Sequence, residues 1–142
     1  MTKALLFSAS AMWQNGGMST SESTNTMKPG DISWAELTTS DVDAAIAYYT
    51  ELFGWTTQPF GEGYTMFANE GRPFGGVLKA PMPDVPTHWK SYVIVTDIDA
   101  AIAKSTGLGG QLCWGPEEIP TVGRIAIVQD PQGAVIGLHQ PA

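Results

Sequence analysis

Residues 37–54 read LTTSDVDAAIAYYTELFG, and residues 93–110 read VIVTDIDAAIAKSTGLGG. Aligned without a gap at an offset of 56 residues, the two stretches are identical at nine of eighteen positions. Self-similarity at a fixed spacing indicates a duplicated supersecondary unit. Two copies, of about residues 31–86 and 87–142, account for the chain once an N-terminal extension of residues 1–30 is set aside.

Each copy begins with a strand that is followed by a helix. Residues 33–39 and 88–95 alternate between two kinds of side chain, which is typical of half-buried strands. The helices that follow carry apolar residues at helical spacing, and Gly54 and Gly107 mark their ends. We expect Ser40 and Thr96 to cap these helices, because an acidic residue stands three positions after each hydroxyl.

The rest of each copy has the pattern of three short strands separated by turns. In the first copy these are residues 55–60, 64–69 and 75–79, and in the second copy residues 111–114, 124–129 and 134–139. Glu117 and Glu118 are expected in a solvated turn between two of these strands. The sequence therefore predicts an α+β fold of two βαβββ modules, which form a curved, cup-like eight-stranded sheet with the helices outside.

The composition argues against several classes of partner. The 142 residues include 14 acidic and 7 basic residues, for a net charge of −7, and nucleic-acid binding needs clustered Lys and Arg. We therefore expect no nucleic-acid partner, and the apolar runs are too short to cross a membrane. Cys113 is the sole cysteine, so the chain has no internal disulfide and no cysteine-based zinc cluster.

The extension of residues 1–30 differs in composition from the rest of the chain. Residues 16–26 are mostly Ser, Thr, Asn and Gly, which is the composition of a linker. The apolar run of residues 4–13 is compatible with a signal peptide, but it is short and has one basic residue before it. We favour an upstream extension, and we expect a cytoplasmic protein.

Several short motifs, taken in order, resemble the vicinal oxygen chelate superfamily, which includes glyoxalase I, bleomycin-resistance proteins, extradiol dioxygenases and fosfomycin-resistance enzymes. The first copy carries Trp34–Asp41 and Leu52–Trp55, and the second carries His88-Trp89, Asp130–Ala134 and Gly137–Pro141. The resemblance covers residues 31–142. It implies a small-molecule site on the inner face of the cup and a homodimer.

Enzymes of this superfamily hold a metal ion with residues on the first and last strands of each module. Carried over onto this sequence, the first-strand positions fall on Trp34 and Lys90, and one last-strand position falls on Gly137. The other falls on Lys79, or on Val77 if the register slips. None of these side chains supplies the carboxylate or imidazole that a divalent ion needs, so we expect no metal site and no cofactor.

Strand alternation places a set of polar and aromatic side chains on the inner face of the cup. The candidate ligand-binding residues are Trp34, Glu36, Tyr64, Lys79, Lys90, Tyr92, Trp114 and His139. Within this set, Glu36 and Lys90 are expected to form an ion pair across the two modules. That pair is either a structural plug of the cup or a polar anchor for a ligand.

Three functions remain open from the sequence. The first is a metal-independent small-molecule binder that sequesters an aromatic or drug-like ligand. The second is an enzyme, an isomerase or lyase, that uses Glu36 with His88 or Tyr92 as acid and base. The third is an interaction module whose cup is filled. A histidine without a visible partner is weak support for catalysis, so we favour His88 as a residue that ends its strand.

Overall fold

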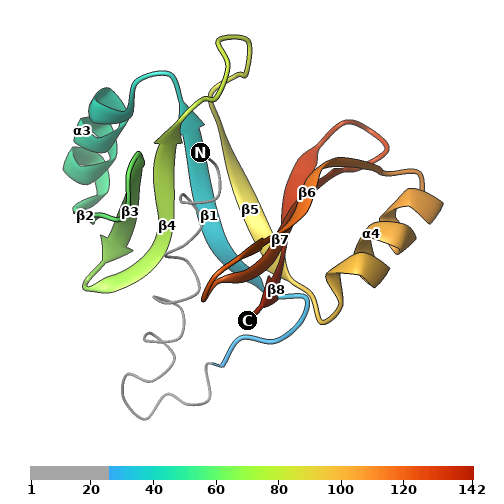
Figure 1. The fold of residues 1–142 in the computed structure, drawn as a ribbon. Helices are drawn as coiled ribbons and strands as arrows, with labels where there is room; N and C mark the ends of the chain where they lie inside the picture. The colour runs from blue at the N-terminus through green and yellow to red at the C-terminus, as the bar shows by residue number, and fades with distance from the viewer. Residues whose placement is uncertain (1–25) are drawn as a thin grey trace.

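The computed structural model describes residues 26–142, which form eight strands and two helices (Figure 1). The segments considered above for a signal peptide and a linker lie almost entirely outside these residues. The elements in chain order are β1 (Ile32–Thr39), α3 (Val42–Phe53), β2 (Thr56–Pro59), β3 (Tyr64–Asn69), β4 (Arg72–Lys79), β5 (His88–Ile94), α4 (Ile98–Gly107), β6 (Gln111–Ile119), β7 (Gly123–Gln129) and β8 (Val135–Pro141). The predicted pair of βαβββ units is confirmed.

The eight strands form a single open sheet in the order β2-β3-β4-β1-β5-β8-β7-β6. The first strands of the two halves, β1 and β5, pair antiparallel at the centre, and each also pairs parallel with the last strand of its own half. The helices lie at opposite ends of the molecule, α3 beside β2–β4 and α4 beside β6–β8 (Figure 1). Neither helix is long and apolar enough to span a membrane, as judged over residues 26–142.

The two helices begin at equivalent aspartates rather than at the hydroxyl residues predicted above. The Asp41 carboxylate accepts a hydrogen bond from the Ala44 backbone N–H, and the Asp97 carboxylate accepts one from Ala100, both at 3.1 Å. Aspartate satisfies an otherwise unpartnered first-turn amide and also favours the positive end of the helix dipole. The prediction of caps at Ser40 and Thr96 is therefore wrong by one residue.

Two strands are longer than the sequence pattern indicated. β4 begins at Arg72, because Glu70 and Gly71 both take positive φ and form a two-residue hairpin turn. β6 continues to Ile119, so Glu117 and Glu118 lie in a strand paired with β7 and not in a solvated turn. Both corrections lengthen strands, and the pairing of β1 with β5 at the centre of the sheet is unaffected.

Alternation along the strands divides the buried residues between the two faces of the sheet. On the outer face, Leu37, Phe67 and Val77 pack under α3, and a separate cluster around Ile98 packs under α4. A third cluster lies on the inner face and draws on both halves of the chain. This inner cluster surrounds the candidate site.

Candidate functional site

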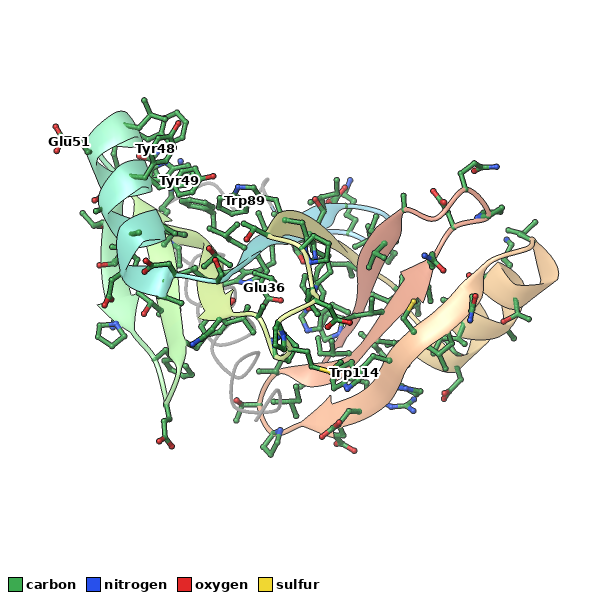
Figure 2. The ribbon with its side chains drawn as sticks, turned by 90° about the horizontal axis from the view of Figure 1, so that it is seen from above. Glu36, Tyr48, Tyr49, Glu51, Trp89 and Trp114 are labelled. Carbon is green, nitrogen blue, oxygen red and sulfur yellow. The ribbon has the colours of Figure 1, made fainter. Side chains whose placement is uncertain are left out.

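The candidate site is built on the two central strands, where the halves of the chain meet. Glu36 of β1 stands directly opposite Lys90 of β5, and Trp34 of β1 stands opposite Tyr92. All four side chains are at most 9% exposed, and so is Tyr64 of β3, at 2%. Figure 2 shows Glu36 between the two halves of the sheet. The sequence therefore predicted five residues that the fold does bring together.

Three groups lie around the Glu36 carboxylate, and a fourth residue, Trp34, holds one of them in place. The Tyr92 hydroxyl donates a hydrogen bond to Glu36 Oε1 at 3.1 Å, and Lys90 Nζ lies 3.5 Å from the same oxygen. The Trp34 indole N–H donates to the Tyr64 hydroxyl at 2.9 Å, which holds that hydroxyl near the carboxylate. The predicted ion pair between Glu36 and Lys90 is thus confirmed.

The second carboxylate oxygen of this group, Glu36 Oε2, is buried and has no hydrogen-bond partner among residues 26–142. Buried polar atoms are nearly always hydrogen-bonded, because an unmet acceptor loses its hydration without compensation. An unpartnered oxygen on a side chain that is 3% exposed marks a place where a donor from outside the described residues would gain a strong, charge-assisted bond.

Burial changes the proton affinities at this site. Desolvation raises the pKa of Glu36 above its ordinary value, although the Lys90 charge and the tyrosine hydroxyls oppose the rise. Desolvation and the neighbouring carboxylate together raise the pKa values of Tyr64 and Tyr92 well above the usual range. The two phenols therefore stay protonated, and the Tyr92 hydroxyl can donate its hydrogen bond to Glu36.

Two glycines explain how large side chains fit at the centre of the inner face. Gly76 of β4 pairs with Glu36, and Gly137 of β8 pairs with Tyr92, at matching parallel positions in the two halves. A Cβ at Gly76 would overlap the Tyr64 ring and hydroxyl, and a Cβ at Gly137 would overlap the Tyr92 ring. Sequence reasoning missed Gly76, although its match to Gly137 in the second half is a signal that could have found it.

The positions that the family resemblance assigns to metal ligands do not fit a divalent ion. Three of them carry the indole of Trp34, the ammonium group of Lys90 and the side-chain-free Gly137. The fourth was expected on Lys79 or Val77, but both lie on the α3 side of β4, and the residue that matches Gly137 in the first half is Gly76. Within residues 26–142 no three His, Cys, Asp or Glu side chains gather as a possible metal site. Glu36 offers carboxylate oxygens beside these positions, but a cation bound to it would meet the Lys90 charge 3.5 Å away.

The remaining predicted residues lie at different depths around this centre. Lys79 is a correction: it shares the outward parity of Val77, which packs under α3, and it is exposed at the end of β4. Trp114 of β6 is half-buried and packs on the edge of the inner cluster (Figure 2). The sequence pattern predicts Lys79 on the inner face, and reading the alternation of β4 one residue out of step is enough to produce this error.

The two histidines are engaged with backbone carbonyls. His88 is half-buried at the start of β5, and its Nδ1 lies 2.8 Å from the Pro86 carbonyl oxygen. His139 is 4% exposed, and its Nε2 lies 2.8 Å from the Val122 carbonyl oxygen. Burial lowers the pKa of His139 below its ordinary value, which favours the neutral ring. The sequence offers His88 or Tyr92 as the acid–base partner of Glu36, and in the structure Tyr92 is hydrogen-bonded to Glu36.

Comparisons with known proteins point to one family. The model of the Glyoxalase/Bleomycin resistance protein/Dioxygenase superfamily matches residues 31–138. "Putative glyoxylase CFP32" of Mycobacterium tuberculosis is 39% identical over 117 residues, which are 80% of this chain and 45% of that protein. "Anthracycline biosynthesis protein DnrV" of Streptomyces peucetius is 30% identical over 129 residues, which are 78% of this chain and 46% of that protein. The chain thus spans about half the length of the curated relatives it matches.

Solved structures show the same fold at lower identity. Methylmalonyl-CoA epimerase of Streptomyces coelicolor has a TM-score of 0.56 and 18% identity, with 81% of this chain and 96% of that chain covered. An extradiol ring-cleaving dioxygenase from B. fuscum has a TM-score of 0.57 and 19% identity, with coverage of 80% and 34%. At this identity the similarity establishes the architecture and leaves the chemistry to the residues of the site.

Proposed function

The chain belongs to the Glyoxalase/Bleomycin resistance protein/Dioxygenase superfamily, and we propose that it binds a small aromatic molecule bearing a hydroxyl group, without a divalent metal ion. The ligand would sit at the inner face of the sheet, where the half-buried rings of Phe60 and Trp114 border the inner cluster. This proposal keeps the small-molecule binder of the sequence analysis and gives its ligand a polar group.

The observation that carries the proposal is the unpartnered, buried oxygen Glu36 Oε2. A hydroxyl on the ligand would supply the donor that this oxygen lacks, and a hydrogen bond to a charged group contributes about 1.5–3 kcal/mol. Indole and phenol rings around the carboxylate suit a flat apolar body. The relative named for anthracycline biosynthesis adds support, because that name refers to polycyclic aromatic compounds.

A pair of matched probes tests the proposal, namely naphthol, which carries a hydroxyl, and naphthalene, which does not. Calorimetric titration in EDTA should show naphthol binding at least about tenfold more tightly than naphthalene, from the hydrogen bond alone. The double variant Glu36→Gln, Lys90→Met should lose this preference, whereas Glu118→Gln, at an exposed site in β6, should keep it. Equal binding of both probes, or binding that EDTA abolishes, would refute the proposal.

The contact between Tyr92 and Glu36 favours a second candidate, acid–base catalysis on a carbon acid. Glu36 would take a proton from the substrate and return it to a neighbouring carbon, as in an isomerase, while Tyr92 donates a hydrogen bond. Because a relative is named a glyoxylase, the probe is the hemithioacetal of methylglyoxal and glutathione in D2O. Deuterium incorporation above the protein-free rate, lost in Glu36→Gln, would support catalysis. Deuterium incorporation at the protein-free rate would contradict catalysis and leave ligand binding as the proposed function.

The third function, an interaction module, remains the alternative to ligand binding, because side chains fill the centre of the inner face. If neither naphthol nor naphthalene binds and the double variant behaves as the wild type, the polar cluster serves as a plug. A homodimer is also proposed from the family, and sedimentation velocity across a concentration series would measure it. A monomer at every concentration would contradict that expectation.

A further inference from the structure

A hollow lies on the face of the sheet opposite the candidate site, between α4 and the outer side of β7 and β8. Its volume is about 320 Å³, at the low end of the range for small-molecule sites. Its walls include Ala101 and Leu108 of α4, Val128 of β7 and Ile136 of β8, so the lining is largely apolar. We call this hollow the α4 groove. None of the candidate site residues discussed above lines it.

The α4 groove exists because the two halves of the chain differ at matching positions. On α3, Tyr49 packs its ring 6.2 Å from the ring of Phe67, and Trp55 lies 5.3 Å from the same ring. The residue 56 positions after Tyr49 is Ser105, and Val128 occupies in β7 the place that Phe67 has in β3. Small side chains thus replace aromatic rings under α4, and the helix stands over unfilled space.

The groove lining includes one basic and one acidic side chain, and the acidic one is already hydrogen-bonded within the chain. Lys104 of α4 lines it and forms no ion pair with any residue of the described part of the chain. Asp130 also lines it, but one oxygen of its carboxylate accepts hydrogen bonds from the backbone N–H groups of Gln132 and Ala134, both at 2.9 Å. An ammonium group at the rim of an apolar groove is complementary to a carboxylate with an apolar tail.

We propose that the α4 groove is a binding site for an apolar monocarboxylate of about ten non-hydrogen atoms. The size follows from the volume, since a water-sized group occupies about 30 Å³. The tail would lie against Val128 and Ile136, and the carboxylate would meet Lys104. This site is separate from the proposed aromatic site, because the sheet lies between them, so neither proposal depends on the other.

Octanoate, with ten non-hydrogen atoms, is the probe, and octanol is its uncharged counterpart. Calorimetric titration of the full chain should give one saturable octanoate site, with octanol binding at least about tenfold more weakly. Lys104→Gln should reduce octanoate affinity to that of octanol.

Two matched variants test the location. Ser105→Tyr places in the groove the residue that α3 carries at the equivalent position, and it should abolish octanoate binding. Ala103→Tyr adds the same ring to the exposed side of α4, away from the groove, and should leave binding unchanged. Lys104→Gln keeps the test decisive if Ser105→Tyr fails to fold, which circular dichroism would reveal.

Several results would overturn the proposal. These are the lack of saturable octanoate binding, equal affinity for octanol, and the same octanoate affinity in Ala103→Tyr and a folded Ser105→Tyr. If octanoate fails to bind and Ser105→Tyr alters the sedimentation coefficient, the groove is instead a contact surface between two copies of the chain.

Discussion

Removing Lys90 should destabilise the fold, and the loss should depend on pH. At a separation of 3.5 Å from Glu36 Oε1, the charge–charge attraction is about 5 kcal/mol at an effective dielectric constant of about 20. Desolvation of both groups offsets much of this attraction, so the intact pair contributes little net stability. Breaking a buried pair is different, because one charge then stays buried alone. We expect Lys90→Met to lower the free energy of unfolding by about 3 kcal/mol at neutral pH.

The double variant Glu36→Gln, Lys90→Met removes both charges and keeps an acceptor for the Tyr92 hydroxyl. Its free energy of unfolding should lie within about 1 kcal/mol of the wild type, which gives a coupling of at least about 2 kcal/mol in a double-mutant cycle. Urea denaturation of the wild type, both single variants and the double variant measures this coupling. Additivity within about 0.5 kcal/mol would refute the reasoning, because it would mean that water screens the pair.

The pH dependence follows from the raised pKa of Glu36. The folded chain holds this proton more tightly than the unfolded chain does, so stability falls as pH rises from 4.5, the ordinary value, through the folded pKa. Lys90 lowers the pKa of Glu36, so Lys90→Met should raise it further and widen the interval. The deficit of Lys90→Met relative to the wild type should therefore shrink toward acid pH. A deficit that is constant with pH would contradict this assignment.

Three further predictions follow from other contacts. Gly137→Ala should lower the free energy of unfolding by about 1–3 kcal/mol, because its Cβ would overlap the Tyr92 ring. Gly107→Ala, which adds a Cβ in open space on α4, is the control and should not destabilise the fold. Equal melting temperatures of the two variants would refute this packing argument. Burial lowers the pKa of His139, so stability should decline as pH falls through 6.5, and His139→Gln should flatten that decline in urea titrations between about pH 7 and pH 5. Asp97→Ala should cost about 1 kcal/mol in thermal denaturation and Thr96→Ala much less, and the reverse order would restore the hydroxyl cap.

The sequence was sufficient for the architecture, because the repeat and the strand alternation are local patterns. The matching stretches around Asp41 and Asp97 predicted two equal modules, and alternation in residues 33–39 and 88–95 assigned most inner-face residues correctly. The caps were misplaced by one residue because Ser40 and Asp41 are both good capping residues, and the sequence alone does not rank neighbours.

The register of β4 and the filling of the inner face were decided by tertiary structure. A slip of one residue turns every side chain of a strand to the other face, so Lys79 was misassigned while Gly76 went unnoticed. The α4 groove likewise depends on how tightly α4 packs on the sheet, which is set by contacts between residues far apart in the sequence.

The amino-acid sequence by itself determined the duplicated βαβββ units, the acidic surface and the set of polar residues near the module junction. Only the tertiary structure decided that Trp34, Tyr64 and Tyr92 close around Glu36 and leave one of its oxygens without a partner. The physical reason is that periodicity is written in neighbouring residues, whereas burial and hydrogen bonding join residues such as Glu36 and Tyr92, which lie 56 positions apart.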